Sequence, residues 1–160
     1  MVPFVLPRIP ASAGALIRDD RGRLLILKPT YKSGWTVPGG QLEESGESPW
    51  EGCRREVMEE TGLSVDTGRL ACVDFLRPKG DRPGGLRFLF DCGSIGQSER
   101  LPIVLQAEEI SAYRWVLPIE AEGVLSGPVG RRVAYGLTAS ETVYLEDGRP
   151  VEGVPGSLSP

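Results

Sequence analysis

The chain has 160 residues, a net charge of −4 and no histidine, and 40% of its residues are hydrophobic. This length and composition predict one globular domain that buries its own core without a disulfide framework. The absence of histidine excludes Ser-His-Asp catalysis, a histidine general base and histidine-ligated zinc. The acidic balance argues against nucleic acid as a partner, and no apolar run is long enough to span a membrane.

Residues 1–10 contain three prolines, which predict an extended N-terminal arm rather than a signal peptide. Such an arm can lie on the domain or on a second subunit, so a homodimer is one expected arrangement. Three cysteines, Cys53, Cys72 and Cys92, stand far apart in partly apolar segments. That spacing is typical of reduced thiols and predicts a cytoplasmic protein without a zinc site.

Residues 11–150 are interpreted as a single domain. Apolar runs at 13–18 and 23–28 flank a turn at 19–22 and predict a β-hairpin. A short strand is expected at 35–37, before Pro38-Gly39-Gly40. Further strands are expected at 69–76, 86–92, 101–106, 112–116 and 142–145, and a second helix is expected within 128–139. Residues 151–160 are rich in Pro, Gly and Ser and predict a flexible tail.

The best-marked helix runs from Ser48 to Thr61. Ser48-Pro49-Trp50-Glu51 is a capping-box sequence with proline at the first helical position, and Gly62 is a C-terminal stop. Trp50, Cys53 and Val57 recur at helical spacing and are expected to face the core.

Acidic residues concentrate on this helix and in the loop before it, because residues 43–60 hold seven of the 22 acidic side chains. Glu56, Glu59 and Glu60 lie three or four residues apart, so their carboxylates share one helix face and repel one another. Arg55 supplies one counter-charge, and a hard divalent cation, Mg²⁺ or Mn²⁺, would supply the rest. The nearby Gly39-Gly40 lets backbone approach a ligand closely, which favours a metal-plus-phosphate site over a merely solvated acidic face.

The pattern Glu47, seven residues, then Arg55-Glu56-Val57-Met58-Glu59-Glu60-Thr61-Gly62-Leu63 resembles the Nudix box. Trp35 to Gly40 is also similar to the segment that precedes the box in that family. The resemblance implies an α/β Nudix fold, in which a mixed β-sheet is sandwiched between helices. One departure is visible: six residues, instead of five, separate Gly40 from Glu47, and this insertion falls in a loop that can absorb it.

By this resemblance Glu56, Glu59, Glu60 and the Gly40 carbonyl would bind the metal, and Arg55 would orient Glu47 and its loop by a salt bridge. A further family carboxylate often precedes a strand with an aromatic residue, and Glu109 is the first choice for it, with Glu108 the second. Glu59 or Glu109 would act as the general base.

These observations predict a Mg²⁺-dependent Nudix-type hydrolase that cleaves a phosphoanhydride bond in a nucleoside diphosphate derivative, a nucleotide or nucleotide conjugate. Lys28, Tyr31 and Lys32 are weaker candidates for contacts to a phosphate or base. The alternatives are a non-catalytic nucleotide-binding module of the same fold and an isopentenyl-diphosphate isomerase-like activity, which would need an accessible cysteine such as Cys53.

Overall fold

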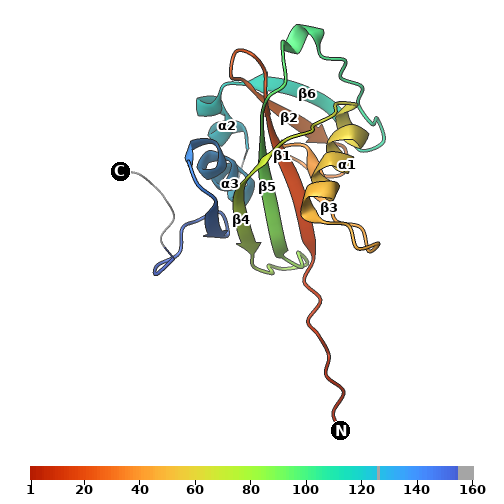
Figure 1. Ribbon diagram of the computed structural model, residues 1–160, viewed down its shortest axis with the longest axis vertical. Helices are drawn as coiled ribbons and strands as arrows, with labels where there is room; N and C mark the ends of the chain where they lie inside the picture. The colour runs from red at the N-terminus through yellow and green to blue at the C-terminus, as the bar shows by residue number, and fades with distance from the viewer. Residues whose placement is uncertain (126, 155–160) are drawn as a thin grey trace.

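The computed structural model describes residues 1–125 and 127–154, in which seven strands form one mixed sheet with helices on both faces (Figure 1). The strand order is β6-β2-β1-β5-β4-β7, and β3 also pairs with β1. The strands are β1 (Ala11–Arg18), β2 (Leu24–Pro29), β3 (Gly39–Gln41), β4 (Arg69–Leu76), β5 (Gly85–Ser94), β6 (Ile110–Val116) and β7 (Val143–Glu146). The helices are α1 (Pro49–Thr61), η1 (Ser98–Arg100), α2 (Pro118–Val124) and α3 (Gly127–Thr138). The expected mixed sheet between helices is therefore confirmed.

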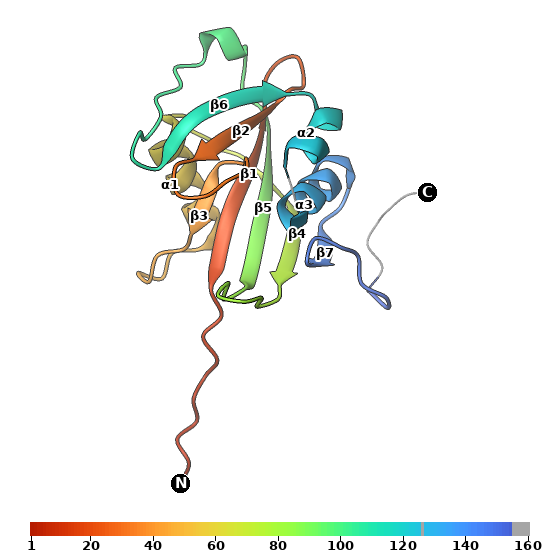
Figure 2. The same ribbon diagram turned by 180° about the vertical axis from the view of Figure 1, so that it is seen from behind.

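The central strand is β1, and its two faces support two separate cores. It pairs antiparallel with β2 and β3 and parallel with β5. Side chains alternate across a strand, so Ala13, Ala15 and Ile17 belong to the core under α1, whereas Leu16 belongs to the core under α2 and α3. Figure 2 shows α1 and the α2–α3 pair on opposite sides of the sheet.

The expected hairpin and capped helix are both confirmed. The β1–β2 turn closes on Asp19, whose Oδ1 accepts hydrogen bonds from the backbone N–H groups of Arg21 and Arg23. At the start of α1, Ser48 Oγ accepts from the Glu51 N–H while Glu51 Oε2 accepts from the Ser48 N–H. Gly62 ends the helix in a left-handed conformation with φ 72°.

The strand expected at 101–106 is wrong. This segment is irregular, and its backbone serves the end of α1 instead of a sheet: the Val104 N–H donates to the Thr61 carbonyl at 2.8 Å. Its alternating apolar residues pack against the core under α1, with Leu101, Ile103 and Leu105 partly buried. The alternation of apolar residues in this segment therefore indicates that one side is buried, but it does not show that the backbone pairs with a strand.

Two further differences concern short elements. The strand expected at 35–37 is only an isolated bridge, in which Thr36 pairs with Leu27, and the paired segment is Gly39–Gln41, the glycines that were expected to end it. Helix α2 was not expected, although Pro118 at its start is a usual signal. Helix α3 and strand β7 lie where the second helix and last strand were expected.

The segments that precede β1 and follow β7 contain no long helix or strand in the part of the chain that the structure describes. Residues 1–10 carry no helix or strand, and Figure 1 shows them extending away from the domain. Of the expected tail, residues 151–154 form a turn closed by a Val151–Val154 bridge, and residues 155–160 lie outside the described part. In the described residues, no helix has both the length and the apolar character that a membrane span requires.

Candidate active site

The acidic face of α1 meets the backbone of β3. Glu60 is only 3% exposed, and its Oε2 accepts a hydrogen bond from the Gly39 N–H at 2.9 Å. The α-carbon of Gly40 lies against the Glu56 carboxylate, so closely that a Cβ at this position would stand 2.4 Å from Glu56 Oε1. A side chain at this position would displace the Glu56 carboxylate, so glycine allows the backbone to approach it.

Arg55 is the hub of the acidic cluster. Its Nε donates to Glu47 Oε1 at 2.6 Å, and its Nη1 lies 3.0 Å from both Glu56 Oε1 and Glu59 Oε2. The hydrogen bond to Glu47, followed by that to Glu56, raises the pKa of Arg55, and the same contact with Arg55 lowers the pKa of Glu47. The arrangement contains the Arg55–Glu47 salt bridge that the sequence resemblance implies.

The loop between β3 and α1 accommodates the inserted residue in a turn over residues 44–46. Glu47 closes this loop, because its Oε2 accepts both from the Glu43 N–H at 2.9 Å and from Arg55 Nη2 at 3.1 Å. Arg55 Nη2 also donates to the carbonyl of Gln41. The insertion therefore extends the outer turn and leaves Gly40 against Glu56.

Burial and mutual repulsion raise the pKa of the two inner carboxylates, Glu56 and Glu60. Burial, with the negative charges of Glu56 and Glu109, raises the pKa of Glu60 to about 8, although the Gly39 N–H opposes this. The pKa of Glu56 is also raised, first by burial, while Arg55 acts in the opposite direction. A cation bound beside them would favour the ionised form of both carboxylates.

The donor chemistry of this cluster fits a hard divalent cation. All its side-chain donors are carboxylate oxygens, and the bare backbone of Gly39-Gly40 runs beside two of them. Glu59 stands further out: its side chain is 46% exposed and is held by Arg55. Among the described residues no group of three or more acidic or thiol side chains is arranged closely enough to hold an ion by itself.

Of the other candidates, the structure brings Glu109 and Tyr31 to the cluster. The charge of Glu109 acts on Glu56, Glu60 and Tyr31, and desolvation followed by these three carboxylates raises the pKa of Tyr31. Glu108 contributes only its backbone carbonyl, which accepts from Thr30 Oγ1.

The two candidate lysines, Lys28 and Lys32, lie in different surroundings. Lys28 Nζ donates to the Gly34 carbonyl at 3.3 Å and lies outside the cavity described next. Lys32 lines that cavity and interacts with Glu60 on one side and with Arg87 and Arg132 on the other.

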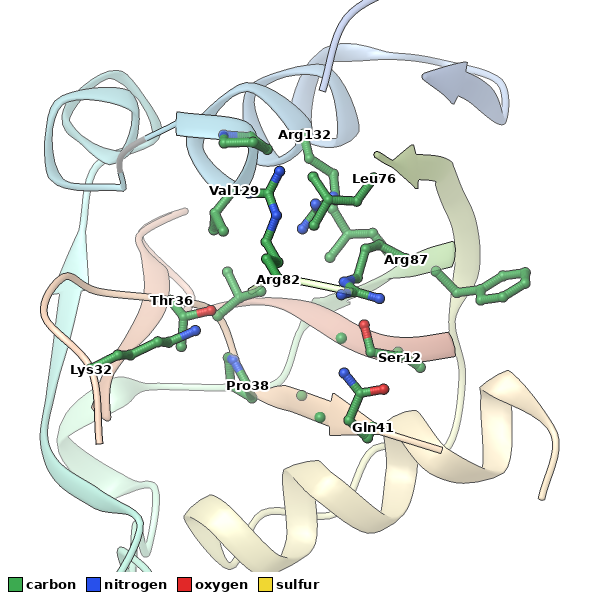
Figure 3. Close-up of a pocket in the computed structure, with 18 of the residues that line it drawn as sticks. Ser12, Lys32, Thr36, Pro38, Gln41, Leu76, Arg82, Arg87, Val129 and Arg132 are labelled. Atoms are coloured by element: carbon green, nitrogen blue, oxygen red, sulfur yellow. The ribbon is translucent and has the colours of Figure 1, made fainter. Parts of the chain in front are cut away.

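A cavity of about 380 Å³ opens beside Gly39-Gly40, on the face of the sheet that carries α3 (Figure 3). Its lining includes three arginines that the sequence did not single out, one on the β4–β5 loop, one on β5 and one on α3: Arg82, Arg87 and Arg132. No sequence signal brought them together, because they are separated by up to 50 residues and occur among many arginines.

Cys53 is fully buried on the inner face of α1, and its Sγ donates to the Gly14 carbonyl at 3.5 Å. Contact with Cys92, followed by burial, raises the pKa of the Cys53 thiol. A buried, protonated thiol is not placed to act on a substrate, which argues against the isomerase-like alternative. All three cysteines are free and buried.

The class of protein follows from the matches of the sequence and the fold. The model of the NUDIX domain matches residues 8–134, so the chain belongs to the NUDIX domain family. The Arg55–Glu47 pair and the glutamates of α1 lie within the matched range.

Individual relatives agree with this class. A MutT-like protein of Streptomyces ambofaciens is 36% identical over 108 residues, 68% of this chain and 63% of the relative. Nudix hydrolase 5 of Arabidopsis thaliana is 27% identical over 75% of this chain and 43% of its own length. The chain thus spans about two fifths to three fifths of these relatives. The crystal structure of a MutT protein from Methanosarcina mazei Go1 matches with TM-score 0.62 and 29% identity, over 73% of this chain and 84% of that one.

Proposed function

We propose that this protein is a Mg²⁺-dependent hydrolase that cleaves a phosphoanhydride bond in a nucleoside diphosphate derivative. The observation that carries the proposal is the meeting of Glu56 and Glu60 with the bare backbone of Gly39-Gly40, at the mouth of a cavity lined by cations. Family membership and the MutT-like relative support the same reaction class.

Glu56, Glu59 and Glu60, with the Gly40 carbonyl, would hold Mg²⁺, or Mn²⁺ in its place. When bound, the ion would neutralise charge on the diphosphate and acidify a bound water. Arg55 fixes Glu56 and Glu59 in place and ties them to Glu47, so the carboxylates keep their positions when a substrate arrives.

The general base would be Glu59 or Glu109. Glu59 is exposed and held by a hydrogen bond to Arg55, whereas Glu109 is close enough for its charge to act on Glu56 and Glu60. Either can take a proton from water at the cluster. Tyr31 and Lys32 lie between the carboxylates and the cavity, where they can contact the substrate's phosphates.

The test is a panel of nucleotides and nucleotide conjugates, assayed for phosphate-bond cleavage with Mg²⁺, with Mn²⁺ and with a chelator. Cleavage that requires one of these two ions and disappears in chelator supports the proposal. Full activity in chelator would contradict the metal mechanism. Binding of nucleotides with no cleavage under any condition would favour the alternative, a nucleotide-binding module. We further propose a cytoplasmic location, in keeping with the three free thiols.

A further inference from the structure

We propose that the cavity beside the carboxylate cluster binds a second phosphate group of the substrate, a phosphate monoester remote from the bond that is cleaved. This inference deepens the function proposed above and rests on it for the reaction. The group that binds here is defined by its chemistry, a compact dianion, whether it is carried on the 2′ or the 3′ oxygen of a ribose.

The first argument is the charge of the cavity. Lys32, Arg82, Arg87 and Arg132 line it, and no aspartate or glutamate of the described chain does. Figure 3 shows the guanidinium groups of the three arginines on one side of the cavity, with Lys32 across from them. Cations that share a lining without carboxylates repel one another, and a bound dianion would reduce that repulsion, whereas a neutral nucleobase would not.

The second argument concerns the hydrogen-bond donors of these arginines. Arg82 Nε is buried and has no hydrogen-bond partner among the described residues, although Arg82 Nη2 donates to the Arg77 carbonyl. The guanidinium of Arg87 donates only to backbone carbonyls of its own loop, those of Leu86 and Gly84. Neither arginine forms an ion pair with a described residue, so both keep charge available for a ligand.

Arg132 is held differently. Its Nε donates to Asp74 Oδ2 at 2.8 Å, and Asp74 is completely buried and also accepts from the Gly148 N–H. Asp74 therefore orients Arg132 from below, outside the cavity lining, and compensates one of the four cations. Burial, followed by the charges of Arg132 and Arg82, lowers the pKa of Arg87, as expected for cations crowded together.

The third argument is the position of the arginines relative to the carboxylates. Gln41 on β3 pairs with Ser12 on β1, Ser12 pairs with Arg87 on β5, and Arg87 pairs with Asp74 on β4. Neighbouring strands lie about 4.8 Å apart, so Arg87 stands roughly 10 Å across the sheet from the strand that touches Glu56. Gln41, Ser12 and Arg87 all line the cavity (Figure 3), so the arginines lie across it from the strand that touches the carboxylates.

The backbone that carries Arg82 is held in a hydrogen-bonded turn beside the cavity. The turn between β4 and β5 is closed by paired hydrogen bonds between Lys79 and Arg82, both of 3.0 Å. A Cβ on Gly84 would stand 2.3 Å from the Leu76 carbonyl oxygen, so glycine is required for this close approach. A preformed turn of this kind reduces the entropy that must be lost when the arginines bind an anion.

Binding can be measured without turnover. Isothermal titration calorimetry would compare AMP with adenosine 2′,5′-bisphosphate and adenosine 3′,5′-bisphosphate on the whole protein. We expect one bisphosphate to bind about tenfold to a hundredfold more tightly than AMP, because charge-assisted hydrogen bonds to one phosphate contribute that much. Equal affinities for all three compounds would overturn the inference.

Three variants assign the effect to the arginines. Arg87→Met and Arg82→Met should each reduce the preference for the bisphosphate severalfold or more, and Arg82→Met removes an Nε that has no partner to lose. Arg8→Met removes the same charge from the exposed arm and should keep the preference. If Arg87→Met and Arg82→Met weaken AMP and the bisphosphate by the same factor, the arginines hold the reacting phosphates instead and the inference is wrong.

Turnover measurements are the second part of the test. They distinguish a failure of the cavity assignment from a failure of the proposed hydrolase function. NADPH with NADH, and coenzyme A with dephospho-coenzyme A, are pairs that differ only in a 2′ or a 3′ phosphate. The phosphorylated member of one pair should show the higher kcat/KM, and Arg87→Met should reduce that ratio. Cleavage in Mg²⁺ without any preference within either pair overturns this inference but leaves the proposed function standing. A bisphosphate preference in calorimetry without cleavage of any compound supports the cavity assignment and contradicts the hydrolase.

Discussion

The acidic face of α1 and the cationic cavity of α3 and β5 adjoin at Gly39-Gly40 and are built in opposite ways. The acidic cluster draws its carboxylates from a short run, residues 47–60, and its own arginine, Arg55, bonds to three of them. The cavity draws its cations from positions 32, 82, 87 and 132, and its lining includes no described carboxylate. A site made from one helix can carry its counter-charge within the same segment, whereas a site made from several elements depends on how the fold assembles them.

The two regions also use their buried carboxylates differently. Asp74 is fully buried with an arginine and a backbone N–H as donors, so its charge is compensated. Glu60 is nearly as buried but has one backbone donor and two carboxylates nearby. Compensated burial stabilises the fold, and uncompensated burial leaves a group that a cation can stabilise.

The largest expected effect is on turnover. Glu60→Gln keeps the shape of the side chain and removes one charge from the inner cluster, so kcat should fall about a hundredfold or more. Glu51→Gln is the matched control: this side chain caps α1 from an exposed position, and glutamine caps equally well. Steady-state kinetics of both variants in Mg²⁺ checks this, and equal turnover would show that Glu60 has no role in the reaction.

Arg55→Ala should also lower kcat, by about tenfold to a hundredfold, because Glu47, Glu56 and Glu59 lose the group that positions them. Arg55→Lys keeps the charge but not the planar fork, so it should recover only part of the loss. The protein should still fold, which a thermal melt would verify. Wild-type kcat in Arg55→Ala would mean that this salt-bridge network does not position the reacting groups.

Asp74→Asn should reduce the free energy of unfolding by about 1–3 kcal/mol, because a charge-assisted hydrogen bond to Arg132 becomes a neutral one inside the fold. Asp66→Asn is the control, since this side chain is 81% exposed and its ion pair with Arg54 is long, at 3.5 Å. Its effect should be close to zero. Urea unfolding of both variants measures the difference, and an unchanged Asp74→Asn would show that the pair contributes no net stability.

The last prediction concerns the pH dependence of stability without metal. The expected effect is smaller and of opposite sign, because here the substitution should stabilise the protein. The pKa of Glu60 is raised from 4.5 to about 8, so the folded protein holds a proton that the unfolded chain releases, and this contribution to stability is lost as pH rises from about 4.5 through about 8. Glu60→Gln does not titrate. Its melting temperature relative to wild type in chelator should therefore rise between about pH 5.5 and about pH 9, by about 2–4 °C for each kcal/mol.

A difference between the two proteins that stays constant with pH would show that the Glu60 proton is not linked to folding. A difference that falls with pH would mean that the ionised carboxylate has a stabilising partner in the folded state.

Local signals predicted much of the fold. The turn at Asp19, the capping box at Ser48 and the stop at Gly62 each need only neighbouring residues, and all three have the expected structure. The segment 101–106 shows where such reasoning stops. Its apolar alternation indicated burial correctly, but only the tertiary structure decides whether a half-buried backbone pairs with a strand or, as here, with the end of a helix.

The sequence by itself determined the acidic cluster, because helical spacing brings Glu56, Glu59 and Glu60 to one face of α1 whatever surrounds them. It also determined that Arg55 lies within reach of them. The tertiary structure decided what those carboxylates meet: β3 brings Gly39 and Gly40 against them, and the packing of α3 over β4 and β5 gathers arginines from distant positions into one cavity. The physical reason is the separation of the contacting residues along the sequence. A helix brings together residues that are three or four positions apart, whereas sheet register and layer packing join residues that no local rule connects.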